Sequence, residues 1–148
     1  MKIENKKAYY DYEIIEKTES GIVLKGSEVK SIRDGKISFK DSYAKVENGE
    51  IYLYNFYIAP YPCSLEKLNP VRKRKLLLKK NEIKRLEKKV SEKGLTIVPL
   101  SVYFNNRGLA KMEIALVKGK KLFDKRRELK EKEIKRQLER KMKDMGAK

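Results

Sequence analysis

Histidine and tryptophan are both missing from this 148-residue sequence, and cysteine occurs once, at Cys63. Histidine is the commonest general base and the commonest metal ligand, so catalysis would have to use carboxylates or lysines. A single cysteine cannot form an internal disulfide, and Cys63 has no metal-binding spacing around it. Phosphate-binding glycine loops and nucleophile-elbow patterns are also missing. We therefore expect no enzyme, no metal site and no cofactor.

Long apolar runs are missing as well. No stretch approaches the roughly 20 apolar residues of a membrane-spanning helix, and the polar N-terminal segment MKIENKKAYYDYE does not have the pattern of a signal peptide. These features predict a cytoplasmic protein. A monomer is favoured because no long apolar heptad repeat occurs outside the C-terminal segment.

Positive charge, in contrast, is abundant. The sequence contains 38 Lys and Arg and 21 Asp and Glu, which gives a net charge of +17. Residues 118–148 supply 14 basic and 6 acidic side chains, a net +8, and the rest of the chain supplies +9. Lysines and arginines release condensed counterions when they contact phosphates, so a nucleic acid is the expected partner. An anionic membrane surface could use the same charge.

Two regions of different composition are predicted, a domain over residues 1–117 and a basic tail over residues 118–148. The tail has no Pro, only two Gly and many good helix formers, but its apolar residues are too sparse to form a core. We expect it to be frayed when free and helical when an anionic groove receives it. An alternative is a solvated helix that packs on its own domain or on a partner, since four apolar residues form one helical stripe. These are Ile134, Leu138, Met142 and Met145.

Alternating apolar and polar residues predict strands at 9–17, 22–25, 39–46, 51–58, 95–104 and 109–117. Turns are predicted at 19–21, 48–49 and 105–108.

The last two strands have clear inward sets. For the first, the expected inward residues are Val98, Leu100, Val102 and Phe104. For the second, they are Ala110, Met112, Ile114 and Leu116.

Two helices are predicted between the strands. One covers 27–34, capped by Ser27 and ended by Gly35, and the other covers 81–93, capped by Asn81 and ended by Gly94. A proline-containing loop begins at Pro60 and ends in the basic run 72–75, for which a solvated loop and a binding contact are equally favoured.

The connections between strands are too short for the crossovers of a parallel sheet. The sequence therefore predicts a mainly β protein with short helices, a small antiparallel barrel of the oligonucleotide-binding type. In such barrels a curved sheet face and its loops bind nucleic acid.

Several short motifs follow one another along the chain. They are Asn5-Lys6-Lys7-Ala8, Gly21-Ile22-Val23-Leu24, the run from Gly26 to Arg33, Asp41-Ser42-Tyr43, Pro70 with Arg72, the run from Arg74 to Leu78, Glu82-Ile83, Lys93-Gly94, Gly119-Lys120-Lys121 and Asp124-Lys125-Arg126. In this order they resemble the small protein B family, the SsrA-binding proteins of bacteria. Each motif alone is weakly specific, but together they cover essentially the whole chain.

The resemblance implies an adaptor of trans-translation. Such proteins bind the tRNA-like domain of transfer-messenger RNA (tmRNA, SsrA) and enter the vacant decoding site of a stalled ribosome. The implied partners are tmRNA, small-subunit ribosomal RNA and, through the charged RNA, elongation factor Tu.

The resemblance also assigns residues. The candidate RNA-binding residues are Asn5, Lys6, Lys7, Tyr10, Glu19 and Leu77. The candidate decoding-site residues are Lys118, Gly119, Lys120, Lys121, Asp124, Lys125 and Arg126, and the residues beyond them would follow the empty mRNA path.

Two positions depart from the family pattern. Tyr10 stands where many relatives have histidine, and Asn69 stands where an aspartate often precedes the proline. The ring of Tyr10 can still stack on a base or ribose, although it cannot be protonated as histidine can.

The physical properties of the residues agree with RNA binding. Folded RNA is recognised through shape, phosphates, 2′-hydroxyls and stacking, and the lysines, amide and tyrosine of residues 5–10 suit these contacts. Glu19 could accept hydrogen bonds from base edges or 2′-hydroxyls. Glu28 would repel phosphate, so we expect it to pair with a lysine or to begin the first helix favourably.

Alternatives remain at this point. The residues around Asn5 could be an ordinary solvated entry to a strand. The whole chain could be a structural ribosomal protein with a basic tail, or a metal-dependent nuclease on a similar barrel.

Overall fold

The computed structural model describes residues 1–119 and 132–140. The chain divides into two units, Met1–Lys118 and Gly119–Lys148, and each is described by itself.

The first unit is mainly β, with three helices among its described residues. In chain order its elements are β1 (Lys2–Glu4), α1 (Lys6–Asp11), β2 (Tyr12–Ile22), α2 (Gly26–Arg33), β3 (Ile37–Ser38), β4 (Tyr43–Glu47), β5 (Glu50–Tyr54), β6 (Tyr57–Ile58), β7 (Arg74–Leu77), α3 (Lys80–Lys93), β8 (Thr96–Phe104) and β9 (Ala110–Gly119).

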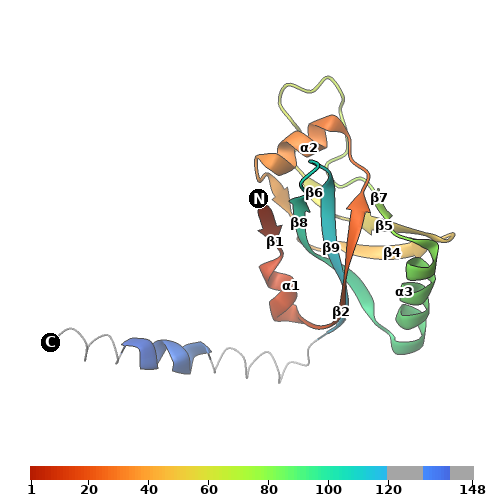
Figure 1. The fold of residues 1–148 in the computed structure, drawn as a ribbon. Coiled ribbons are helices and arrows are strands. Elements are labelled where there is room, and N and C mark those ends of the chain that lie inside the picture. The colour runs from red at the N-terminus through yellow and green to blue at the C-terminus, as the bar shows by residue number, and fades with distance from the viewer. Residues whose placement is uncertain (120–131, 141–148) are drawn as a thin grey trace. The chain divides into compact units, whose positions relative to one another are not determined.

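The main sheet closes into a barrel. Its strand order is β1-β8-β4-β5-β7-β2-β9, and β9 pairs back to β8. The strands from β8 round to β9 therefore form a ring, and β1 lies outside it along one edge of β8 (Figure 1). Helices α2 and α3 lie at opposite ends of this ring (Figure 1). The predicted antiparallel barrel is confirmed.

Two apolar clusters support the barrel. The larger fills its interior and includes the fully buried Ile32, Leu53, Phe56 and Leu76. The smaller lies beneath α1. Its buried members are Ala8, Val98, Leu100, Ala115 and Val117.

Strand β8 contributes to both clusters because its alternation changes at a register shift between Pro99 and Ser101. Such an irregularity reverses which face a side chain takes. The predicted inward set of this strand is therefore wrong as a single face: Val98 and Leu100 pack under α1, whereas Val102 and Phe104 belong to the barrel interior. The set predicted for β9 is confirmed in the interior.

The beginning of the chain differs most from the prediction. Residues 9–11 belong to α1 rather than to a strand, and residues 19–21 continue β2 rather than forming a turn. Gly21 allows β2 to lie close to the Leu77 side chain of β7, since a Cβ built on Gly21 would lie 3.1 Å from the Cβ of Leu77. Ser20 is buried and donates its hydroxyl to Met112 O at 2.9 Å. The predicted strand 22–25 contributes only Ile22 to β2.

Both predicted helices exist, but their caps differ. Helix α2 is capped at Lys25, whose N–H donates to the Glu28 carboxylate at 2.8 Å, and α3 is capped at Lys79. Ser27 and Asn81 are therefore not the caps. The predicted ends are confirmed by the left-handed backbone of Gly35 and Gly94, with φ of 71° and 62°.

The remaining segments refine the prediction. The 48–49 hairpin turn is confirmed by φ values of 51° and 77°, whereas the strand expected at 51–58 is broken into β5 and β6 by Asn55, which has φ of 61°. Only residues 72 and 73 of the run 72–75 precede the strand, and Lys73 is exposed, whereas Arg74 is buried at the start of β7.

In the second unit, residues 132–140 form an α-helix with every residue exposed. Ile134 and Leu138 are 52% and 56% exposed and occupy one face. None of the described helices is long and apolar enough to cross a membrane.

Candidate functional site

Asn5 fixes α1 to the barrel. Its side-chain oxygen accepts a hydrogen bond from Ala8 N at 3.2 Å, which makes Asn5 the N-cap, and its side-chain nitrogen donates to Pro99 O at 2.8 Å. The Asn5 N–H also donates to Leu100 O at 2.7 Å. Asn5 is thus an anchor, with one amide hydrogen and one oxygen lone pair left for another partner.

Lys6 and Lys7 follow in the first turn of α1, and both are exposed. Cations near a helix N-terminus oppose the helix dipole, so helix stability does not explain them. The buried face of this short helix is Ala8, which packs against β8. The two lysines therefore extend into solvent from a helix that is fixed to the barrel by Asn5 and Ala8.

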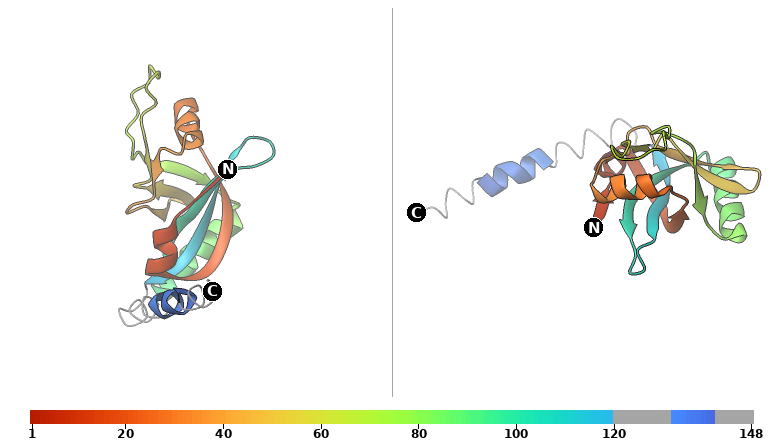
Figure 2. Two further views of the ribbon diagram at one scale, coloured as in Figure 1. Left: turned by 90° about the vertical axis from the view of Figure 1, so that its left-hand side faces the viewer. Right: turned by 90° about the horizontal axis from the view of Figure 1, so that it is seen from above.

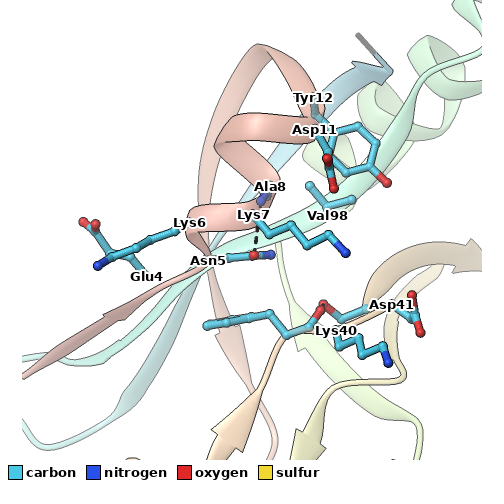
Figure 3. A pocket seen from close by; sticks show the side chains of 12 residues that line it. Glu4, Asn5, Lys6, Lys7, Ala8, Asp11, Tyr12, Lys40, Asp41 and Val98 are labelled. Carbon is cyan, nitrogen blue, oxygen red and sulfur yellow. Dashed lines mark hydrogen bonds between the residues drawn. The ribbon is translucent and has the colours of Figure 1, made fainter. Parts of the chain in front are cut away.

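A hollow of about 450 Å³ lies between α1 and the segment 39–42 (Figure 3). Its lining includes Val98 and Ala8, and charged side chains of both signs surround it. These are Glu4, Lys6, Lys7, Asp11, Lys40 and Asp41. In Figure 3, Lys7 and Lys40 extend from opposite elements and their amino groups end on the same side of the hollow.

The segment 39–42 is held in shape by its own hydrogen bonds. Asp41 has φ of 60°, its carbonyl accepts from Asn55 Nδ2 at 3.2 Å, and the Ser42 hydroxyl donates to Phe39 O at 2.5 Å. The hollow with paired lysines suits a phosphate group, while the neighbouring carboxylates suit hydroxyl or amino donors of a nucleotide. Sequence reasoning missed Lys40 and Asp41 as part of this site, because they are distant from α1 in the chain.

Tyr10 also lies on α1 and is half-buried. Its neighbour Tyr9 is 39% exposed, and the Lys17 amino group lies 5.4 Å from the centre of the Tyr9 ring. Figure 2 shows α1 from a second side, along the outside of the barrel.

Glu19 is exposed on β2, and its carboxylate accepts a hydrogen bond from the Tyr103 hydroxyl of β8. Burial, together with this hydrogen bond and the nearby carboxylate charge, raises the pKa of Tyr103, so the hydroxyl stays protonated and remains a donor. The Lys2 amino group lies 5.8 Å from the centre of the Tyr103 ring. A carboxylate has about four lone-pair positions, so Glu19 keeps capacity for an outside donor. Sequence reasoning did not find Tyr103.

Leu77 is 50% exposed at the end of β7, opposite Gly21. Its side chain lies over the Gly21 backbone. Because side chains alternate along a strand, Glu19 and Gly21 share the outer face of β2, so Glu19 and Leu77 lie on the same outer surface. The sequence-predicted residues therefore form two groups, one on α1 and one across β2 and β7.

The candidate tail residues are only partly described. Lys118 and Gly119 are the exposed last residues of β9. The others lie outside the described residues: Lys120, Lys121, Asp124, Lys125 and Arg126.

Glu28 forms a buried ion cluster with two arginines from the run that was expected to be a loop. Its carboxylate accepts from Arg72, from Arg74 Nε at 2.7 Å and from Lys25 N at 2.8 Å. Arg74 also donates to the carbonyl oxygens of Phe56 and Pro70. Glu28 thus pairs with arginines rather than with a lysine. The other expectation, a favourable position at the beginning of the helix, is confirmed by its place in the first turn of α2 and its bond to Lys25 N. Glu28 also joins α2, β7 and the long loop before β7.

Among the described residues, no group of three or more His, Cys, Asp or Glu side chains could hold a metal ion. The candidate residues on α1, β2, β7 and β8 are lysines, an amide, tyrosines and single carboxylates. Side chains of these kinds can bind a ligand through hydrogen bonds, charge and stacking.

The comparisons with known proteins agree over nearly the whole chain. The model of the family described as SmpB protein matches residues 2–144. An SsrA-binding protein of Aquifex aeolicus is 61% identical over 142 residues, which are 95% of this chain and 90% of that protein. An SsrA-binding protein of Thermus thermophilus is 55% identical over 138 residues, 93% of this chain and 96% of the relative. A chain of the solved structure "tmRNA-SmpB: a journey to the center of the bacterial ribosome" matches with a TM-score of 0.70 and 56% identity, over 82% of this chain and 85% of that one.

Proposed function

This chain belongs to the SmpB family, and we propose from that premise that its barrel binds transfer-messenger RNA while its tail acts in the ribosome. The protein is an RNA-binding adaptor of trans-translation that binds the tRNA-like domain of tmRNA and delivers it to stalled ribosomes. The observation that carries this conclusion is the family match over residues 2–144, together with a relative named for SsrA binding at 61% identity.

On the barrel, the α1 group supplies charge and the β2–β7 group supplies specificity. Lys6 and Lys7 contact phosphates beside the hollow, and Asn5 holds them in place and offers its remaining donor. Glu19 accepts from base edges or 2′-hydroxyls, Tyr10 stacks on a base or ribose, and Leu77 makes an apolar contact. Two contacts support this proposal. Asn5 fixes α1 to the barrel, and the protonated Tyr103 hydroxyl orients Glu19.

In the tail, Lys118 to Arg126 occupy the vacant decoding site, and the residues beyond follow the empty mRNA path. The net +8 of residues 118–148 supports this assignment, because ribosomal RNA is a polyanion. The helix at 132–140 is consistent with a rod that can lie along such a path.

The protein acts in the cytoplasm, where ribosomes translate, and acts as a monomer without a catalytic step. Elongation factor Tu reaches it through the charged RNA.

The test compares two carboxylates on one strand. Glu19→Ala removes the proposed acceptor, and the control Glu13→Ala removes the same charge from the same face of β2, where Glu13 is also exposed. We expect Glu19→Ala to weaken binding of the isolated tRNA-like domain, while both variants bind an unrelated duplex RNA like the parent. Equal losses for both RNAs would show that Glu19→Ala damages the fold, and equal losses in both variants would show that position 19 has no special role. Either result would sink this assignment.

A further inference from the structure

The outer face of β4, β5 and β7 holds three tyrosines and three lysines, here called the tyrosine platform: Tyr43, Tyr52, Tyr54, Lys45, Lys73 and Lys75. The alternate residues of these strands, such as Ala44, Leu53 and Leu76, are buried in the barrel interior. Because strand side chains alternate between faces, the platform residues point outward.

The register brings these side chains into adjacent rows. Tyr43 is opposite Tyr54, and Tyr52 lies between Lys45 on one side and Lys75 on the other. The Tyr43 and Tyr54 rings are stacked, with centroids 5.3 Å apart and an interplanar angle of 16°.

Lys73, just before β7, completes the platform. Its amino group lies 4.1 Å from the centre of the Tyr52 ring and 5.9 Å from that of Tyr54. The cation therefore lies over aromatic faces while its side chain remains exposed.

Two carboxylates hold the platform in shape. Glu47 accepts from the Tyr54 hydroxyl and from the Lys73 amino group at 3.2 Å, and Glu50 lies 3.4 Å from the Lys75 amino group. Exposed ion pairs of this kind contribute little to stability. A phosphate can therefore compete with either carboxylate for its lysine.

Sheet stability explains only part of this arrangement. A cross-strand pair such as Tyr43 and Tyr54 does stabilise a sheet, but Tyr52 has a lysine on each side and no aromatic cross-strand partner in the register. Aromatic faces interleaved with lysines are the combination that binds unpaired nucleotides, because bases stack on the rings and phosphates meet the cations.

We propose that the tyrosine platform is a further RNA-binding surface, which receives a short unpaired stretch of RNA with bases stacked on Tyr52 and Tyr54 and phosphates at Lys73 and Lys75. It continues along β7 toward Leu77. At its other end Tyr43 directly follows Ser42, which lines the hollow beside α1. The RNA belongs either to tmRNA or to the ribosome, since the chemistry is the same for both.

The first experiment uses a short single-stranded RNA that contains 2-aminopurine, whose fluorescence falls on stacking, and the full chain at raised salt to weaken the electrostatic contribution of the tail. The double variant Tyr52→Leu/Tyr54→Leu keeps apolar side chains but loses the rings, so affinity should fall by at least about fivefold. Tyr52→Phe/Tyr54→Phe keeps the rings and should bind and quench like the parent. Tyr57→Leu, at an exposed tyrosine of β6, is the matched control and should also bind like the parent.

Parental binding by the leucine variant would overturn the proposal, and so would equal losses in the leucine and phenylalanine variants. If the leucine variant does not fold, Lys73→Gln replaces it, since the rings remain while the cation is lost; unchanged affinity and unchanged salt dependence for this variant would contradict the proposal.

The second experiment identifies the source of the RNA by ultraviolet cross-linking of the parent to tmRNA and, separately, to salt-washed ribosomes. Mass spectrometry should locate a nucleotide on Tyr52 or Tyr54 in one of the two samples. A protein cross-link at this face, with no nucleotide in either sample, would assign the surface to a protein partner and overturn the proposal. Glu19→Ala leaves the tyrosine platform intact. Its weaker binding of the tRNA-like domain tests the proposed function, whereas the weaker binding of single-stranded RNA by Tyr52→Leu/Tyr54→Leu tests the platform, so either proposal can fail without the other.

Discussion

Glu28 is a carboxylate with 4% of its surface exposed, and its charge is balanced by Arg72 and Arg74. Glu28→Gln would leave the buried Arg74 guanidinium without its counter-charge, which typically costs about 3–5 kcal/mol. We expect a large fall in the free energy of unfolding, measured by urea titration. Glu87→Gln, which removes an exposed carboxylate of α3, is the control and should change it little.

The same residue predicts a pH dependence. Burial raises the pKa of Glu28, but the hydrogen bonds from Arg72, from the Lys25 N–H and from Arg74 outweigh burial and hold the pKa below its ordinary value of 4.5. The unfolded chain therefore takes up this proton first as the pH falls, so the stabilisation is complete above about pH 4.5 and is lost as the pH falls through the folded-state pKa. Unfolding titrations across the acid range should show a shallower decline for Glu28→Gln than for the parent. If the free energy of unfolding declined in parallel for the parent and Glu28→Gln, the loss of stability in acid would not be caused by Glu28.

Tyr103 is a positioning residue for Glu19. Tyr103→Phe keeps the ring under Lys2 but removes the hydroxyl that donates to Glu19. We expect weaker binding of the tRNA-like domain, by about tenfold, since one hydrogen bond to a charged group is worth about 1.5 kcal/mol or more, and a retained fold. Tyr57→Phe serves as the control. Binding at parental strength by Tyr103→Phe would remove Tyr103 from the site.

At the residue level, sequence reasoning could identify surface chemistry but not three-dimensional pairing. The position of Glu28 in the first turn of α2 could be expected from the sequence. Its pairing with arginines could not, because nothing local in the run 72–75 distinguishes an inward arginine from its outward neighbours. The Glu19–Tyr103 contact joins residues 84 positions apart, so no local pattern indicates it.

At the level of elements, α1 is a short helix that depends on its cap. Asn5→Ala removes both the bond to Ala8 N and the bond to Pro99 O, and cap loss alone costs about 1 kcal/mol. Asn5→Ser keeps a capping oxygen but cannot donate to Pro99 in the same way. We expect the free energy of unfolding to be highest for the parent, lower for Asn5→Ser and lowest for Asn5→Ala. The affinity for tmRNA should fall in the same order, because α1 no longer holds Lys6 and Lys7 in place.

Two outcomes would contradict this account of α1. Unchanged stability in Asn5→Ala would mean that the cap is dispensable. Loss of RNA binding with full stability in both variants would mean that Asn5 acts only by contacting RNA.

The elements that sequence reasoning placed correctly are those with strong local chemistry. The Asn48-Gly49 turn and the glycine ends of α2 and α3 need positive φ, which few other residues adopt.

The errors occur where packing between residues distant in the sequence determines the secondary structure. Residues 9–11 alternate like a strand, yet the Asn5 cap and the packing of Ala8 on β8 make them helical. In β8, no residue pattern revealed the register shift at Pro99, because both of its faces are apolar there.

At the level of the whole molecule, the account separates RNA binding by the barrel from ribosome rescue by the tail. β9 extends to Gly119, so a truncation after Gly119 preserves the whole strand, whereas the boundary expected from sequence at residue 117 would shorten it. The buried residues of β9 end at Val117. The truncated protein should therefore fold and bind tmRNA.

Helix formation in the tail can be tested independently of charge. Leu138→Pro lies in the interior of the helix 132–140, more than one turn from its start, and should break it without changing any charge. Leu138→Ala removes the same apolar side chain but favours a helix, so it is the matched control. We expect circular dichroism to show less helix only in the proline variant.

The most direct measurement of the central claim is peptide tagging by tmRNA on ribosomes stalled with an empty mRNA path. It compares the parent, the truncation after Gly119, Leu138→Pro and Leu138→Ala, each with its tmRNA affinity measured in parallel. All four should bind tmRNA equally, the parent and Leu138→Ala should support tagging, and the truncated protein and Leu138→Pro should not. Full tagging by the truncated protein would contradict the division between barrel and tail, and full tagging by Leu138→Pro would show that the charge of the tail suffices without its helix.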